Sequence, residues 1–496
     1  MKSTTAAALL LAGATLLLAP AAQGSPLFEL AGDTMGSGGH NARAASTSAA
    51  ATYFNPALLP RVKQGFGLGM LVLSDQISMT LDGRPGGDVP VSIGRDRNVR
   101  DGNGDLIPND TFPTDWLENG CDTGGCDPPF APRPRQADGS SGNTRTYVGI
   151  GLVSQLIDDK LVIGLHALIP VGQFTEAQQF HVDHREQFFS NSLHPELYSD
   201  RLTATSLSFG AGSQLLDNLS LGVSFTLNLQ NTAGAGTYVR DSADYDQLEL
   251  ATDVQVRTGV SPHFGLVFSP TDDTNLSLTA HSPQKLEIVT RFGAALPSGA
   301  ESDTTRTAVH AYTPWTFALG GDVGLTDEFA LVATVGYSLW SQYEDRQGNS
   351  PGDFYGDDFA WNNTLQVNLG GRYSVGDANL FLDLGYQPSP VPDQDGASNY
   401  VDNDRASANL GGDFAFTVAD LTLRPGLQAQ IHRILPRSVT KDDSLIRDEV
   451  PDDAVNGSTQ APIVGREGLQ TNNPGWPGFA SEGWIFGGAF SLTLEY

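Results

Sequence analysis

One segment of the chain has the spacing of a calcium-binding loop. Residues 101–110 place oxygen donors at Asp101, Asn103, Asp105 and Asn109, the first, third, fifth and ninth positions of such a loop. The segment lacks the glycine expected at position six and the glutamate expected at position twelve. It predicts either a structural calcium site or an acidic loop without a metal, and the two departures favour the acidic loop.

Two cysteines, Cys121 and Cys126, lie close together in a segment rich in proline, glycine and aspartate. A metal site would usually need further Cys or His residues nearby. In an exported protein this spacing therefore favours a single disulfide. A loop this short restricts the unfolded chain little, so the bond should contribute little to global stability.

The sequence lacks the common signatures of catalysis and of nucleic-acid binding. It contains no Gly-x-Ser-x-Gly, no His-Glu-x-x-His and no phosphate-binding loop, and its nine histidines are scattered. We predict that the protein is not an enzyme, although folding could still bring a Ser and a His together. The net charge of −29 argues against nucleic-acid binding, which needs Lys and Arg for the phosphates.

Residues 1–24 have the composition of a secretory signal peptide. Lys2 precedes an apolar run over residues 6–19, and Ala22 and Gly24 offer small side chains near a cleavage point. A membrane anchor is the weaker alternative, because a spanning helix needs about 20 apolar residues. We therefore expect an exported mature chain that is not a helical membrane protein.

The rest of the chain, residues 63–496, reads as β-strands with one apolar face each. In one such strand Leu365, Val367 and Leu369 alternate with polar side chains, as period-two alternation requires. Six short Asp-bearing turns separate seven longer polar segments. The turns are 158–159, 217–218, 272–273, 326–327, 376–377 and 419–420. The long loops are roughly 83–142, 183–200, 232–252, 293–305, 347–359, 390–402 and 438–479, the first and last being the longest.

Seven hairpins joined by six turns require fourteen strands. Short turns at one end and long loops at the other are typical of an antiparallel transmembrane β-barrel of the bacterial outer membrane. The fold class is therefore all-β, with a barrel of about 14 strands. The last strand supports this prediction, because Trp484, Phe486, Phe490, Leu492 and Tyr496 share one face. It resembles the C-terminal signal by which the barrel-assembly machinery recognises its clients.

Residues 25–62 come before the first strand and fit neither a strand nor a long amphipathic helix. The part from Gly36 to Arg61 is small, weakly polar and nearly uncharged. We predict that it folds into the lumen as a hatch, or plug.

Strand parity also nominates basic side chains that would face the lumen. They are Arg257, Lys285, Arg291, Arg372 and Arg424. A base that meets a carboxylate contributes about 1.5–3 kcal/mol, so these residues are candidates for orienting an amphiphilic ligand. The alternative for each is a solvated lumen residue.

The run Asn55-Pro56-Ala57-Leu58, preceded by Ala42-Arg43-Ala44, resembles a motif of the FadL/TodX-type family of outer-membrane transporters for long-chain fatty acids and other hydrophobic molecules. Further matches are Pro314-Trp315-Thr316, the run Tyr337–Ser341 and the run Tyr386–Pro392. The resemblance covers most of the mature chain and implies a fourteen-stranded barrel with an N-terminal hatch. The long first loop with its cysteines differs from the family.

The resemblance implies roles for particular residues. Asn55, Pro56, Ala57 and Arg43 would belong to the gating part of the hatch. A kink in the third strand, where Pro170 and Gly172 stand here, would open a lateral exit to the bilayer. Proline in a strand is also compatible with a plain bulge or an edge.

The expected function is passive uptake of long-chain fatty acids or similar hydrophobic molecules through the outer membrane of a Gram-negative bacterium. The expected partners are the ligand, outer-membrane lipid and lipopolysaccharide, and the barrel-assembly machinery. The chain should be a monomer without a cofactor, apart from the calcium considered above. A diffusive porin and a surface adhesin are the alternatives.

Overall fold

The architecture is that of a computed structural model. It describes residues 26–82, 99–100, 106–107, 138–139, 143–157, 160–171, 205–229, 236–238, 249–295, 301–344, 360–396, 398–419, 421–446, 473 and 475–496.

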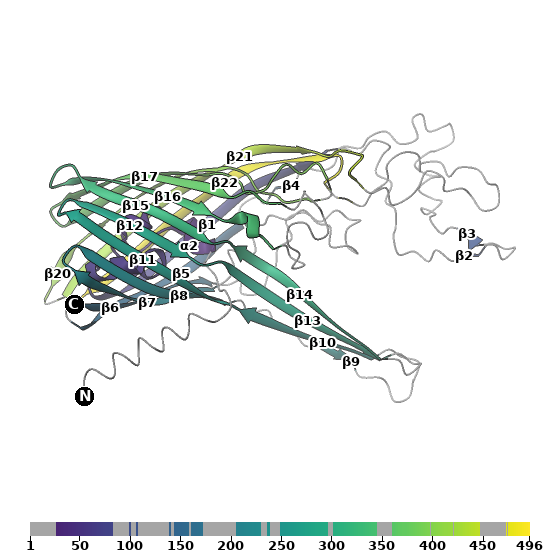
Figure 1. Ribbon diagram of the computed structural model, residues 1–496, viewed down its shortest axis with the longest axis horizontal. Helices are drawn as coiled ribbons and strands as arrows, with labels where there is room; N and C mark the ends of the chain where they lie inside the picture. Colours follow the sequence, from purple (N-terminus) through teal and green to yellow (C-terminus); the bar gives the residue numbers. More distant parts are fainter. Residues whose placement is uncertain are drawn as a thin grey trace.

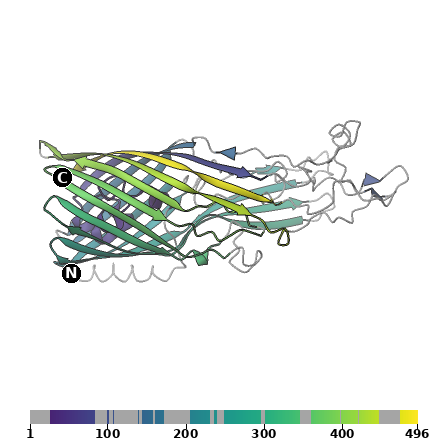
Figure 2. The ribbon, with the colours of Figure 1, turned by 90° about the horizontal axis from the view of Figure 1, so that it is seen from above.

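Fourteen antiparallel strands form a closed ring (Figures 1 and 2). Each strand pairs with the next in the chain, and β22 pairs with β1 over its whole length to close the ring. The ring confirms the predicted fourteen-stranded barrel, and it leaves no strand edge that lipid would have to satisfy. In ring order the strands are β1 (Gly65–Leu81), β5 (Asn143–Ile157), β6 (Leu161–Val171), β7 (Thr205–Leu216), β8 (Leu219–Leu229), β11 (Val260–Thr271), β12 (Thr274–His281), β15 (Thr316–Gly324), β16 (Phe329–Ser338), β17 (Thr364–Val375), β18 (Ala378–Gln387), β19 (Arg405–Phe414), β21 (Leu421–Thr440) and β22 (Gly478–Glu495).

The barrel faces are the reverse of those in a water-soluble protein. On β12 the outward Leu276 and Leu278 are 46% and 51% exposed, whereas Ser277 and Thr279, which alternate with them, are buried toward the lumen. An apolar outer face and a polar inner face are what a wall in lipid needs.

Two of the expected long loops are partly strands. The segments 232–252 and 293–305 contribute to a four-stranded sheet that projects beyond the ring (Figure 1). Its strands are β9 (Gly236–Tyr238), β10 (Glu249–Thr258), β13 (Gln284–Ala295) and β14 (Glu301–Thr313). Threonine and other β-branched residues are frequent in these strands and favour extended backbone, although the strands are polar. Short strands complete the set: β2 (Val99–Arg100), β3 (Leu106–Ile107), β4 (Asp138–Gly139) and β20 (Phe416–Val418).

The lumen contains the segment that precedes β1 (Figures 1 and 2). We call residues 26–62 the hatch. Its helices are α2 (Pro26–Ala31), α3 (Ala42–Ala45), α4 (Ala51–Phe54) and η1 (Pro56–Arg61), and a separate turn η4 (Trp340–Gln342) follows β16. Helices this short are unstable alone. Here η1 packs on β7, β8 and β11, while α3 packs on β12, β15 and β16.

Among the described residues, no helix combines the length and the apolar character needed to cross a membrane.

Candidate functional site

The Asn55-Pro56 turn fits against glycines of the barrel wall. Asn55 is fully buried; its side-chain amide donates to the Arg43 carbonyl at 2.8 Å, and its oxygen accepts the Ala57 N–H at 3.2 Å. A Cβ atom on Gly222 or Gly265 would overlap this turn. The absence of wall side chains is therefore what lets the hatch backbone approach the strands so closely.

Arg43 belongs to a buried polar cluster at the hatch surface. Its guanidinium donates to Glu29 Oε1 at 2.6 Å, and the Tyr53 hydroxyl donates to the same oxygen at 2.7 Å. Burial alone would raise the pKa of Glu29, but Arg43 and the nearby His281 together lower it well below its usual value. Glu29 is therefore an anion that joins α2 to α3 and α4.

A second ion pair connects the hatch to the wall. Asp383 of β18 is fully buried and accepts from Arg372 of β17 at 2.7 and 3.2 Å. The same carboxylate accepts from the Asn41 side chain at 2.9 Å, and Arg372 also donates to the Gly38 carbonyl at 2.8 Å. We call these contacts the Asp383 latch. Both Asn41 and Gly38 lie in the hatch, so a charge pair of the wall fixes the hatch in place.

The other predicted bases lie at different heights along the barrel. Arg424 lies near the turn end of the barrel and bridges Asp413 at 2.6 Å and Glu495 at 2.8 Å. Lys285 lies on β13 and pairs with Glu344 at 2.9 Å and Glu287 at 3.1 Å.

Arg291 is exposed on β13, and Arg257 lies on β10 with its backbone opposite Glu287. The structure therefore does not gather the five predicted bases into one site. Arg372, Arg424 and Lys285 are held in ion pairs.

The described pairs of the third barrel strand, β6, extend further on one side than on the other. Toward β5 the pairs run without a register shift from Val153↔Gly164 up to Thr146↔Val171. Toward β7 the pairs of the described residues stop at Leu168↔Ser206. On the β7 side, the position that this register would place opposite Pro170 lies outside the described residues. Toward β5, Pro170 pairs in register with Tyr147, so the described pairing has no bulge at Pro170 on that side. Gly172 lies outside the described residues.

Helix α2 packs against the inner wall beside the last described β6–β7 pair, Leu168↔Ser206. Leu27, Phe28 and Leu30 belong to one buried apolar cluster with Leu168, and the Phe28 ring stacks on His166 at 4.8 Å. The cluster continues along the inner face of β1 and its neighbours. The apolar end of the hatch therefore lies behind the β6–β7 boundary.

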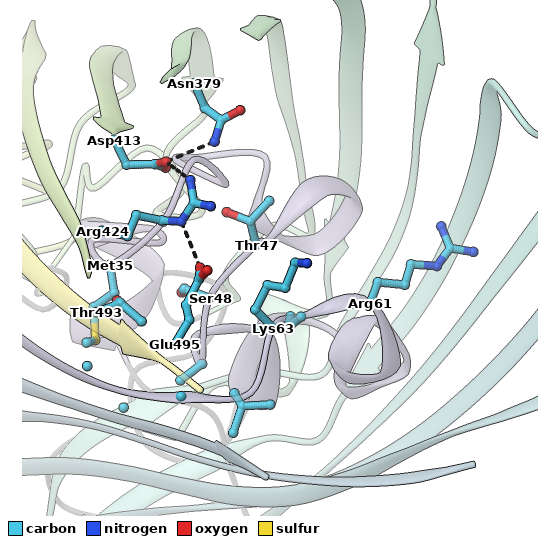
Figure 3. Close-up of a pocket in the computed structure, with 17 residues that line it drawn as sticks. Met35, Thr47, Ser48, Arg61, Lys63, Asn379, Asp413, Arg424, Thr493 and Glu495 are labelled. Atoms are coloured by element: carbon cyan, nitrogen blue, oxygen red, sulfur yellow. Dashed lines mark hydrogen bonds and ion pairs between the residues drawn. The ribbon is translucent and has the colours of Figure 1, made fainter. Parts of the chain in front are cut away.

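A cavity of about 210 Å³ lies between the hatch and the wall at the turn end (Figure 3). Met35, Ala49 and Val153 line one part of it. Arg424 with its two carboxylates lines another, and Lys63 points toward the space from the start of β1 (Figure 3).

The opposite, long-loop end is crossed by residues 388–396 and 398–404, which we call the mouth segment. Arg437 of β21 donates to the carbonyls of Val391, Pro392 and Asp402 at 2.5–3.0 Å. Lys441 donates to the carbonyls of Gln394 and Ser398 at 2.7 and 2.5 Å. Two cations, the half-buried Arg437 and the buried Lys441, thus organise the mouth segment.

Adjacent residues of the mouth segment reach opposite sides of the barrel. Tyr400 joins an aromatic cluster with Tyr343 and Trp361 that extends to Tyr312 on β14. Val401 belongs to a cluster that includes residues of β1. Strand β15, which continues β14, and β1 are opposite members of the ring.

Residues 18–442 match the model of the outer membrane protein transport protein family (OMPP1/FadL/TodX). The chain belongs to this family. A FadL homologue from Pseudomonas aeruginosa has a similar solved structure, with 13% identity, coverage of 96% of this chain and 98% of that one, and a TM-score of 0.50. The P. putida toluene transporter TodX has 12% identity, coverage of 96% and 99%, and a TM-score of 0.47. No curated protein matches the sequence.

Membership of the FadL/TodX family makes this chain a transport protein of the outer membrane. Several residues at the hatch–wall contacts were not predicted from sequence, notably Asp383, Glu29 and His281. One signal for Asp383 was available. The turn at 376–377 fixes the β17–β18 register. In this register Asp383 lies opposite Gly370, and Arg372 lies opposite Phe381, two positions from Asp383 on the same strand.

Two predictions concern residues outside the described ranges. They are the disulfide of Cys121 with Cys126 and the calcium site at Asp101, Asn103 and Asp105. Within those ranges, no group of three His, Cys, Asp or Glu residues is arranged to hold a metal ion.

Proposed function

We propose that this barrel takes up long-chain fatty acids or similar hydrophobic molecules passively, with the hatch as gate and a lateral exit beside β6. The observation that carries the proposal is the position of α2. Its apolar side chains Leu27, Phe28 and Leu30 pack on the inner wall at the β6–β7 boundary, beside the last pair that the described residues of these strands form. Moving α2 would expose an apolar surface directly behind that boundary.

The energetics favour a ligand recognised by its apolar part. Each buried methylene contributes about 0.8 kcal/mol, so a tail of several carbons outweighs one ion pair. The lumenal Arg372 and Arg424 already hold carboxylates of the wall. Recognition of a fatty acid through either base would first have to break such a pair. We therefore propose that tail burial supplies the affinity.

The β6–β7 boundary is the place to test the lateral exit. The register Leu168↔Ser206 extrapolates to Ile169 opposite Thr205, so Ile169→Cys with Thr205→Cys should link the two strands. A matched control, Ile163→Cys with Ala211→Cys, links the same strands at an established pair. Both pairs of substitutions are made in a background with Cys121→Ser and Cys126→Ser.

Uptake of radiolabelled oleate and toluene by cells is then measured with and without reductant. We expect the Ile169–Thr205 link to abolish uptake reversibly and the control link to leave it intact. Unchanged uptake through the oxidised Ile169–Thr205 link would refute the lateral exit.

A diffusive porin and an adhesin are the alternatives to this function. A lumen occupied by the hatch should give no swelling of proteoliposomes in small sugars, whereas a porin would. An adhesin would leave oleate and toluene uptake unchanged when its gene is deleted. We also propose that the chain acts as a monomer and not as an enzyme. The outward Trp484, Phe486 and Phe490 of β22 suit contact with outer-membrane lipid and with the assembly machinery.

A further inference from the structure

We propose that the cavity at the turn end of the barrel is a second binding site, for small uncharged apolar molecules, and that the Met35 side chain closes its inner side. The inference rests on the proposed function, because it concerns a hydrophobic cargo. It adds a site on the far side of the hatch from the mouth segment. Figure 3 shows Met35 at this cavity, beside the strands that line it.

Met35 lies over a trough made of four glycines. Gly67 of β1 is the register partner of Gly151 of β5, and Gly69 is the partner of Gly149. A Cβ atom at any of the four would lie within 4 Å of the Met35 side chain, at 2.6 Å for Gly67 and 3.7 Å for Gly69. These glycines leave a shallow channel in the wall, and Met35 occupies it.

Four glycines facing one side chain need a physical reason. Glycine weakens a strand and usually marks a place where a backbone or a ligand approaches closely. Here the hatch residue that approaches all four glycines is Met35, through an unbranched and flexible side chain, and Ala49 also approaches Gly151. Methionine repacks readily around differently shaped ligands. The trough is thus a surface that a displaced Met35 would expose to a slim apolar molecule.

The trough connects two apolar regions of the lumen. At its lower end lies the cavity of about 210 Å³, with Ala49, Val62 and Val153 on its apolar side. Along the inner face of β1 the next residues are Leu71 and Leu73, which belong to the cluster around α2. A molecule in the trough would therefore be in contact with apolar groups in both directions.

The charges around the cavity favour an uncharged ligand. Arg424 is neutralised by Asp413 and Glu495. Arg61 and Lys63 also line the cavity, but both are exposed to solvent, which screens their attraction for an anion, and Arg61 donates to Asn275 and Ser269. The volume suits a single ring, since an apolar cavity of about 150 Å³ is enough to bind benzene.

The methionines of the chain provide a direct test. Apart from the initiator there are three, Met35, Met70 and Met79. Met70 faces lipid at 49% exposure, and Met79 is buried near the mouth at 1%. The mature full-length protein is labelled with ¹³C at the methionine methyl groups, placed in detergent micelles and titrated with toluene.

We expect the Met35 methyl resonance to shift saturably, because the ring displaces or stacks on it. The Met79 resonance should not move, and the Met70 resonance should follow the non-saturable partition of toluene into the micelle. A Met35 resonance that stays in place, or that moves only in proportion to Met70, would overturn the proposal.

A double variant at Gly69 and Gly149 fills the trough without a severe clash. Cβ atoms at Gly69 and Gly149 would find their nearest neighbours at 3.4 and 3.5 Å, which are ordinary contacts. Gly69→Ala with Gly149→Ala should weaken the Met35 response to toluene at least fivefold. The matched control is Gly336→Ala on β16, with nearest neighbours at 4.0 Å and no part in the cavity. An equal response in both proteins would contradict the assignment.

Uptake separates this proposal from the function on which it rests. If the wild-type protein takes up toluene but Met35 does not respond, the second site is wrong and the transport function stands. If the cells take up neither oleate nor toluene, the transport function fails, whether or not the Met35 methyl resonance shifts.

Discussion

Replacing Asp383 with alanine should release the hatch while the barrel stays closed. The carboxylate accepts two bonds from Arg372 and one from the Asn41 side chain, and its removal leaves a largely buried guanidinium unpaired. Breaking a buried pair by removing one partner costs about 3–5 kcal/mol. If that cost falls on the closed position of the hatch, opening becomes more frequent by roughly two to four orders of magnitude.

Hydrogen exchange followed by mass spectrometry measures this opening in the detergent-solubilised protein. Peptides from residues 40–54 report the hatch, and peptides from β22 report the barrel. We expect faster exchange in the hatch peptides of the Asp383→Ala variant, with β22 unchanged. Heat-modifiable migration in gel electrophoresis checks that the barrel is intact.

Asp413→Ala is the matched control. Asp413 also lies on the inner wall and pairs with Arg424 at 2.6 Å, but its described partners, Arg424 and Asn379, are both wall residues. This variant should leave hatch exchange within a few-fold of the wild type. Unchanged hatch exchange in Asp383→Ala, or an equal rise in Asp413→Ala, would refute the role of the latch.

Three further predictions concern the hatch. Asn55→Ala combined with Pro56→Ala should impair oleate uptake in a normally inserted barrel, because the turn loses its hydrogen bonds to the Arg43 and Ala57 backbone; normal uptake would contradict its gating role. Gly222→Ala should raise hatch exchange because its Cβ overlaps the Pro56 backbone, whereas Gly336→Ala, whose nearest neighbours lie at 4.0 Å, should not. Burial lowers the pKa of His40 to about 4, so the closed hatch favours neutral imidazole. The stabilisation of the closed hatch by neutral His40 is present above about pH 6.5 and is lost as the pH falls toward 4. Hatch exchange, corrected for intrinsic rates, should therefore rise from pH 7 to pH 5, and His40→Gln should reduce that rise.

The strand pattern was predictable because its causes are local. Alternation along each strand and the Asp-bearing turns depend on neighbouring residues, and they led to fourteen strands. Parity also predicted that Arg372 and Arg424 face the lumen. Parity carries no information on height along the barrel, so it could not separate these two from Lys285 and Arg291 on the projecting sheet.

The contacts of the hatch were not predictable in the same way. Asn41 and Asp383 are separated by 342 positions, and only the closed ring brings them together. The pairing of each lumenal base with a wall carboxylate likewise depends on register across strands. Pro170 suggested an irregularity in β6, but only the ladder showed that the proline pairs in register with Tyr147 of β5.

The glycines of the inner wall have an evolutionary consequence. Several of them, such as Gly164 against Thr52 and Gly212 against Pro56, leave no room for even one more carbon between wall and hatch. A mutation that enlarges either surface must wait for a compensating change in the other, so the two parts of the gene are inherited as a matched set. In chimeras that join the N-terminal segment of one relative to the strands of another, the hatch should therefore fit the wall poorly and close the lumen incompletely.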